Sequence, residues 1–127
     1  MLNGSVYYIL HIMDDFGSYI KQRRLELGGR DNSLRRVAED VSLEPSYLSK
    51  IERGLAPPPG EEAITRIAQR LGLNPDVTLA MAGKISSELH AAIVRRPELF
   101  ARLIRTITEQ PDDAIIKIVE EIRDGEW

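Results

Sequence analysis

The sequence contains no cysteine and only two histidines, His11 and His90. The absence of cysteine excludes disulfide bonds and thiolate metal sites, and it is typical of proteins of the reducing cytosol, so we expect a cytoplasmic protein. Two histidines cannot supply a multi-histidine metal site, and neither stands in a pattern typical of a catalytic triad. We therefore expect no metal, no cofactor and no catalytic site.

Long apolar runs are also missing. The longest candidate, Val6–Met13, spans about a third of a bilayer, and neither a basic flank nor a cleavage site accompanies it, so we expect neither a membrane segment nor a signal peptide. The stretch Val6–Ile12 is rich in β-branched and aromatic residues and could form a strand, and the alternative is a loosely held N-terminal arm at residues 1–13.

Neither sign of charge dominates the chain, whose net charge is −3. Residues 1–56 carry eight basic and eight acidic side chains, whereas residues 85–127 carry six and nine. The acidic excess therefore lies in the C-terminal third, and the N-terminal part can still present basic side chains on one face.

Apolar residues follow the helical period of 3.6 almost everywhere after residue 13. Ser33 and Asn74 stand at N-cap positions, Gln110 and Pro111 repeat the pattern of Asn74 and its following proline, and glycines follow several apolar stretches. These signals predict an all-α protein with helices at residues 15–27, 34–41, 45–53, 61–71, 75–82, 87–95, 97–109 and 111–124.

Residues 33–54 have the pattern of a helix-turn-helix. Two short helices flank a turn at Ser42–Glu44, and the second helix buries Leu48 and Ile51. Its other face carries short or basic side chains that can enter the major groove of DNA and hydrogen-bond to base edges; these are Ser46, Ser49, Lys50 and Arg53.

The spacing resembles that of the Cro and lambda-repressor family, also called the xenobiotic-response-element (XRE) family. The resemblance covers about residues 15–83 and rests on Phe16, Gly17, Ala38, the run 46–49, the run 51–54 and the helix pattern of residues 59–76. It implies a five-helix DNA-binding domain at residues 14–83, followed by a C-terminal extension of about three helices at residues 84–127.

The resemblance also implies roles for individual residues. It places Glu44, Pro45, Ser46, Ser49 and Lys50 at base-facing positions. It places Tyr47 and Arg53 near the phosphate backbone. Further candidates for phosphate contacts are Arg35 and Arg30. The chain departs from the family where Leu34 replaces a common glutamine, where Glu44 replaces a Ser or Thr cap, and in a longer loop at residues 28–32.

Arg24 lies on the apolar stripe of the first helix, four residues after Ile20 and three before Leu27. A charge in that position requires a partner. Glu52 is the best candidate, because the family commonly pairs these two positions, so we expect a structural Arg24–Glu52 ion pair.

Together these features indicate a transcriptional regulator. The leading hypothesis is a repressor that binds a near-palindromic DNA operator as a homodimer. The C-terminal helices would then form the dimer, although they could instead pack within the chain. An alternative is an antitoxin-type protein that autoregulates its operon and binds a second protein through those helices. An enzyme with a helix-turn-helix appendage is a third hypothesis, for which the short C-terminal third leaves little room.

Overall fold

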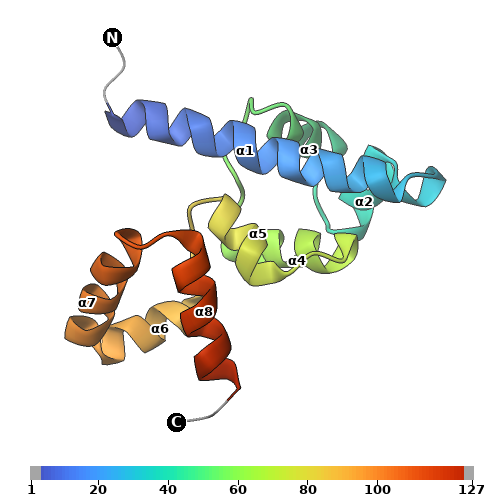
Figure 1. Ribbon diagram of the computed structural model, residues 1–127. Helices are drawn as coiled ribbons and strands as arrows, with labels where there is room; N and C mark the ends of the chain where they lie inside the picture. The colour runs from blue at the N-terminus through green and yellow to red at the C-terminus, as the bar shows by residue number, and fades with distance from the viewer. Residues whose placement is uncertain (1–3, 125–127) are drawn as a thin grey trace. The chain divides into compact units, whose positions relative to one another are not determined.

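Helices make up all the regular structure of residues 4–124, which are the residues that the computed structural model describes; side chains are described from residue 11 onward. The all-α prediction is confirmed, and no strand occurs in this range (Figure 1). The helices are α1 (Gly4–Leu27), α2 (Leu34–Asp40), α3 (Pro45–Glu52), α4 (Glu61–Leu71), α5 (Pro75–Met81), α6 (Ser87–Arg95), α7 (Pro97–Thr108) and α8 (Asp112–Arg123), with a short 3-10 helix, η1 (Arg30–Asn32), before α2.

The predicted strand at residues 6–12 is wrong. This stretch forms the beginning of α1, which starts at Gly4 rather than at residue 15 as expected. Extending an existing helix adds one backbone hydrogen bond for each residue that is fixed, whereas a strand here would have no neighbouring strand to pair with. Leu27 also differs from expectation, because at the end of α1 it is 41% exposed.

Local capping signals mark several helix ends. The Ser33 hydroxyl accepts a hydrogen bond from the Arg36 amide, and the Asn74 side chain accepts one from the Val77 amide, as N-caps do. Gly72 ends α4 in the left-handed conformation, with φ of 68°. At α8 the cap is Pro111 instead of the expected Gln110, so the helix begins one residue later.

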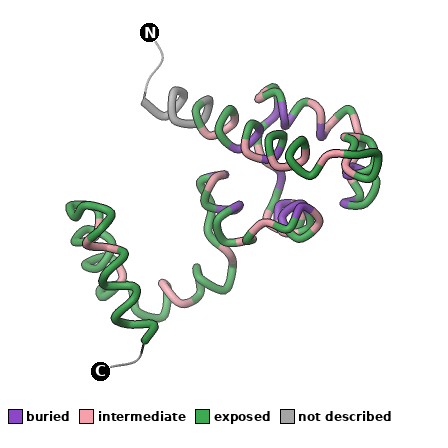
Figure 2. The backbone as a smooth tube through the Cα atoms, turned by 45° about the vertical axis from the view of Figure 1, so that its right-hand side comes forward, coloured by how far each residue is buried: buried purple, intermediate pink, exposed green. Residues whose placement is uncertain are grey.

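The structure divides into two compact units between Ser86 and Ser87. In the first unit, α1–α5 surround one continuous core, which Figure 2 shows in purple. The side chains that are almost completely buried in it are Phe16, Ile20, Val37, Ala38, Val41, Leu48, Ile51, Ile64, Ile67, Ala68, Leu71, Thr78 and Leu79. This unit therefore has enough buried apolar surface to hold its five helices together.

The second unit contains α6, α7 and α8, and none of its described residues is buried. Figure 2 shows this part of the chain in green and pink only. Exposed large apolar side chains occur on all three helices, and these are Leu89, Val94, Leu99, Leu103, Ile104, Ile116, Ile118, Val119 and Ile122. Three helices of 9 to 12 residues without a buried core are not expected to be stable alone.

Two features bring α1 and α3 together. Gly17 is the first: a Cβ at this position would lie 2.9 Å from the carbonyl oxygen of Glu52 and closer still to that of Ile51. The absence of a side chain therefore lets the α1 backbone lie directly against the last turn of α3.

The ion pair between Arg24 of α1 and Glu52 of α3 is the second feature. The Arg24 Nε and Nη2 atoms donate to the two carboxylate oxygens of Glu52 at 2.9 and 2.8 Å. The two side chains are only 11% and 2% exposed. Hydrogen bonding to Glu52, with its negative charge in support, raises the pKa of Arg24 against the lowering effect of burial. The expected Arg24–Glu52 pair is thus present, in a bidentate and largely buried form.

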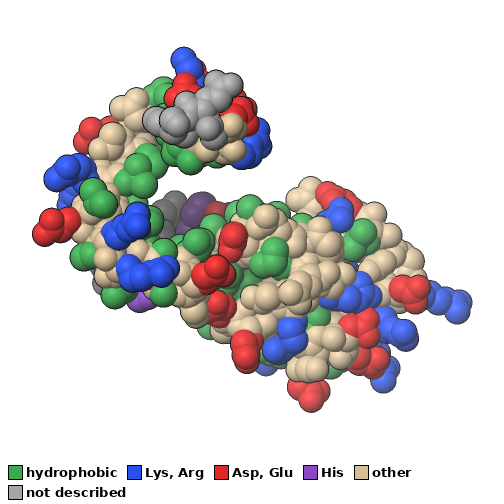
Figure 3. Space-filling view, turned by 90° about the horizontal axis from the view of Figure 1, so that it is seen from below, with side chains coloured by type: hydrophobic (Ala, Val, Ile, Leu, Met, Phe, Trp, Pro, Cys, Tyr) green, Lys and Arg blue, Asp and Glu red, His purple; other side chains and the backbone are tan. Residues whose placement is uncertain are grey.

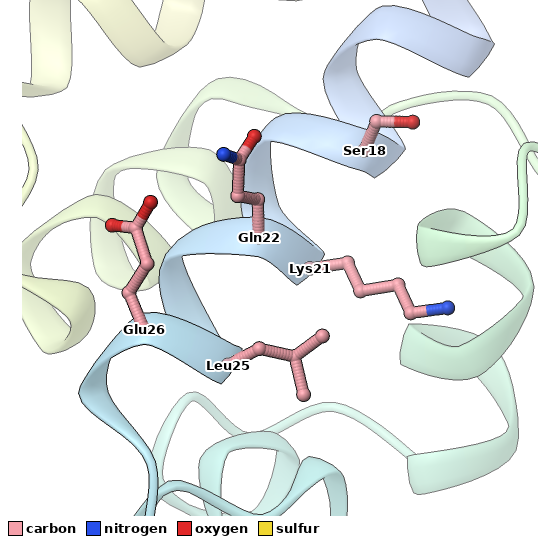
Figure 4. Close-up of a pocket in the computed structure, with 5 residues that line it drawn as sticks. All are labelled: Ser18, Lys21, Gln22, Leu25 and Glu26. Atoms are coloured by element: carbon pink, nitrogen blue, oxygen red, sulfur yellow. The ribbon is translucent and has the colours of Figure 1, made fainter.

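By contrast, another part of the α1 surface is open to solvent. Its side chains line a shallow hollow, and Figure 4 shows Ser18, Lys21, Gln22, Leu25 and Glu26 projecting from this one helix. Ser18 directly follows Gly17 but is exposed, which makes it a useful control for substitutions in α1.

Gly17→Ala should lower the free energy of unfolding by about 1–3 kcal/mol, because the added methyl group would force α1 and α3 apart. Urea denaturation followed by circular dichroism measures this change. Ser18→Ala is the matched control and should change stability by no more than about 0.5 kcal/mol. If both variants unfold at the wild-type midpoint, the close contact of α1 with α3 does not exist in solution.

Glu52→Ala should cost about 3–5 kcal/mol, because it leaves the buried Arg24 guanidinium without its partner. The exposed pair Arg35–Glu39, with side chains 83% and 54% exposed, provides the control, and Glu39→Ala should cost less than about 1 kcal/mol. Equal urea midpoints for the wild type and Glu52→Ala would show that the Arg24–Glu52 pair contributes nothing to stability.

Candidate nucleic-acid interface

A tight turn of residues 41–44 connects α2 to α3. The Leu43 amide donates to the Ala38 carbonyl at 2.9 Å, and the Ser42 amide donates to the Glu39 carbonyl at 3.1 Å. Ser42 itself adopts a left-handed conformation with φ of 61°, which is uncommon for a residue with a side chain. These bonds satisfy the last carbonyls of α2 and redirect the chain into α3 within four residues.

Small and apolar side chains pack α2 against α3. Val37 and Ala38 on α2 are fully buried, as are Leu48 and Ile51 on α3. The small Ala38 side chain lets the two helix axes approach closely. Because α2 has 7 residues and α3 has 8, neither would be stable without this packing.

The outward face of α3 is polar. Residues 46, 49, 50 and 53 follow the helical spacing on the side opposite Leu48, Ile51 and Glu52. Ser46, Lys50 and Arg53 are exposed, and Ser49 is partly exposed. The Arg53 Nε donates to the Ser49 carbonyl at 3.3 Å. The structure therefore brings these four expected contact residues together on one surface, which we call the α3 outward face.

At the start of α3, Glu44 occupies the N-cap and Pro45 the first helical position. Glu44 is exposed, and its side chain makes no capping hydrogen bond. A Ser or Thr in this position would use its hydroxyl on the helix amides, so this departure leaves a carboxylate projecting beside the α3 outward face.

The remaining expected contact residues lie around this face rather than on it. Tyr47 is half-buried and packs against the core. Arg35, in the first turn of α2, is exposed and reaches Glu39 at 3.4 Å. Arg30 lies in η1 and is exposed, and no hydrogen bond or ion pair among residues 11–124 connects its side chain to α3.

Arg70 of α4 has a structural role that the sequence did not reveal. Its Nε donates to Asp40 of α2 at 2.9 Å, its Nη1 donates to the Asn32 side chain at 2.9 Å, and its Nη2 donates to the Asp31 carbonyl. The Asn32 carbonyl also accepts from Arg24 Nη1 at 3.3 Å. The long loop before α2 is thus fixed from two sides, by α1 and by α4.

A second arginine of α4, Arg66, donates through Nε to the Val41 carbonyl at 3.1 Å. Together with Arg70 it attaches the end of α2 to α4. The sequence shows only that these two arginines are four residues apart on the polar side of an amphipathic helix. Their partners include backbone carbonyls and loop residues, which only the tertiary structure identifies.

The geometry of this region suits hydrogen bonding to a large polar ligand. Within the described part of the chain, no group of three or more His, Asp or Glu side chains is arranged to hold a metal ion. None of the described helices combines the length and apolar character needed to span a membrane. The α3 outward face offers hydroxyl, ammonium and guanidinium donors on a helix that is fixed from behind, which is the arrangement needed to read base edges in a major groove.

Comparison with known proteins identifies the same region as a helix-turn-helix domain. A protein-family model described as a helix-turn-helix domain matches residues 15–81, slightly more than half of the chain. Among solved structures, the clp gene regulator ClgR from Corynebacterium glutamicum is 24% identical, with a TM-score of 0.48, over 78% of this chain and 96% of the ClgR chain. No curated protein sequence matches the chain.

The family match begins one residue before Phe16 and ends with the last residue of α5, so α6–α8 lie outside it. The matched region contains every core residue of the first unit except Ala82, together with the α2–turn–α3 element and the Arg24–Glu52 pair. On this basis the chain belongs to the helix-turn-helix family of DNA-binding regulators, as the resemblance to the Cro and lambda repressors implied.

Proposed function

We propose that the protein is a transcription repressor that binds a near-palindromic DNA operator as a homodimer. The observation that carries this proposal is the α3 outward face, which presents Ser46, Ser49, Lys50 and Arg53 on a helix locked from behind by Arg24 and the core. Placing such a helix in the major groove lets short side chains approach the base edges.

The proposed contacts differ along α3. Ser46, Ser49 and Lys50 contact base edges, Glu44 accepts a hydrogen bond from a cytosine amino group, and Pro45 also faces the base edges. Arg53, Tyr47, Arg35 and Arg30 lie toward the phosphate backbone, where arginine and tyrosine position a protein without reading sequence. In this arrangement the carboxylate of Glu44 restricts the operator, because it disfavours a backbone phosphate at the same place.

The second unit supports the homodimer. Nine of its large apolar side chains are 41–62% exposed, whereas the first unit already has a core of its own. A second copy of the chain would bury these side chains in an isologous interface. The dimer would hold two α3 helices about 34 Å apart, which matches half-sites one turn of DNA apart.

Lys50→Ala and Ser46→Ala should each weaken operator binding by about 1–3 kcal/mol if the side chain makes a good base contact. Gel shift of the purified protein on its own promoter at about 50 mM salt measures the effect, since low salt favours phosphate contacts. Lys117→Ala in α8 and Ser18→Ala in α1 are matched controls and should bind like the wild type. No shift by the wild type at this salt concentration would contradict DNA binding, and equal binding by all four variants would contradict the assigned face.

Leu103→Lys should convert the dimer to a monomer, because it places a charge within the exposed apolar stripe of α7. Light scattering at increasing protein concentration gives the molar mass of each species. The control Ala101→Lys adds the same side chain on the other side of α7, at an exposed position, and should remain a dimer. A wild type that is monomeric at all concentrations would exclude the homodimer, and would leave a second protein as the partner of α6–α8.

A further inference from the structure

The ends of α7 carry opposite charges. Arg95 and Arg96 lie where α6 meets α7, and Asp112 and Asp113 lie where α7 leads into α8. All four residues are exposed. The 12 residues of α7 separate the two positions by about 18 Å along the helix axis. We call them the basic corner and the acidic corner.

Neither corner is neutralised within the described part of the chain. Arg95 and Arg96 line a hollow together with Ala92 and Phe100, and no acidic side chain contributes to it. No hydrogen bond or ion pair in residues 11–124 involves the side chains of the two arginines or the two aspartates. The aspartates stabilise the first turn of α8, and Arg95 stabilises the last turn of α6, through the helix dipole. Glu98 and Lys117 are nearby in the sequence, but neither forms an ion pair with the corner residues in the described part of the chain.

Between the corners, α7 presents exposed apolar side chains. Leu99, Leu103 and Ile104 are 59%, 48% and 49% exposed, and Figure 3 shows hydrophobic side chains of this kind on the molecular surface among charged ones. The stripe they form extends from the basic corner toward the acidic corner. A partner that covers the stripe therefore meets a positive charge at one end and a negative charge at the other.

We propose that this partner is a second copy of the chain, with the two α7 helices antiparallel, so that the basic corner of each protomer faces the acidic corner of the other. This inference rests on the proposed homodimer and specifies its geometry. In a two-fold antiparallel pair each contact occurs twice, so four arginines meet four aspartates around a buried apolar stripe. In a parallel pair the arginines would face arginines and the aspartates would face aspartates, which would oppose dimer formation.

A charge-reversal experiment on the full chain tests this geometry. One variant carries Arg95→Glu and Arg96→Glu, a second carries Asp112→Lys and Asp113→Lys, and a third carries all four substitutions. In the antiparallel pair the first two variants have like charges at both contacts as homodimers, but opposite charges at both contacts when they are mixed. Sedimentation velocity with one chain labelled gives the dissociation constant of each pair.

At about 50 mM salt, we expect each double variant alone to dimerise at least about tenfold more weakly than the wild type, because charges at an interface act on partner choice. The mixture should form a heterodimer close to wild-type affinity, and the variant with four substitutions should regain the homodimer. Ala101→Lys serves as the charge control, since it adds a charge on α7 away from both corners.

The outcomes separate this inference from the proposed dimer. A monomeric wild type would overturn both, whereas a dimeric wild type whose double variants show no preference for mixing would overturn the corner contacts alone. Preferential pairing of the Arg95→Glu/Arg96→Glu chain with the wild type would indicate a parallel pair. If circular dichroism shows that a variant does not fold, the salt dependence of the wild-type dimer distinguishes the two arrangements. The dissociation constant of the antiparallel pair must rise with salt, whereas that of a like-charged parallel pair must fall.

Discussion

The bidentate ion pair between Arg24 and Glu52 is the interaction on which the position of the α3 outward face depends. Glu52 is the last residue of α3, and α3 is too short to hold its own conformation. The pair attaches that last turn to α1, and Gly17 allows the two backbones to lie in direct contact. Arg24 also donates to the Asn32 carbonyl, so the same side chain holds the loop that leads into α2. The orientation of the α3 outward face is therefore set by a charge on the far side of the helix, inside the protein.

The two units differ in what holds them together. The first unit buries a complete apolar core and adds polar clamps, among which Arg66 and Arg70 attach α4 to α2 and to the loop before it. The second unit buries no residue in its described part, although all three of its helices carry large apolar side chains. The first unit buries its apolar side chains in its own core, whereas the apolar side chains of α6–α8 would need an apolar surface elsewhere to cover them. This contrast is why we propose that the first unit reads DNA and that the second unit forms the dimer.

Much of the fold could be predicted because its signals are local. Ser33 and Asn74 mark helix starts by their own side chains, and α4, α5 and α6 begin and end within one residue of the expected positions. A partner for Arg24 could be foreseen because a charge on an apolar stripe requires one, and the family resemblance pointed to Glu52. Residues 6–12 were assigned wrongly because β-branched and aromatic residues report packing context more than backbone preference. The contacts of Arg70 with Asp31, Asn32 and Asp40 join segments 30 to 39 residues apart, and no local pattern encodes them.

The most direct test of this account is selection of bound sequences from a random DNA pool by the purified full chain. We expect an enriched motif with two related halves in opposite orientation, with centres about 10 base pairs apart, as two α3 helices in successive major grooves require. A folded chain with Lys50→Ala and Ser46→Ala should enrich a changed or weaker motif. A well-folded wild type that enriches no sequence above the input pool would contradict the claim that this helix-turn-helix reads an operator.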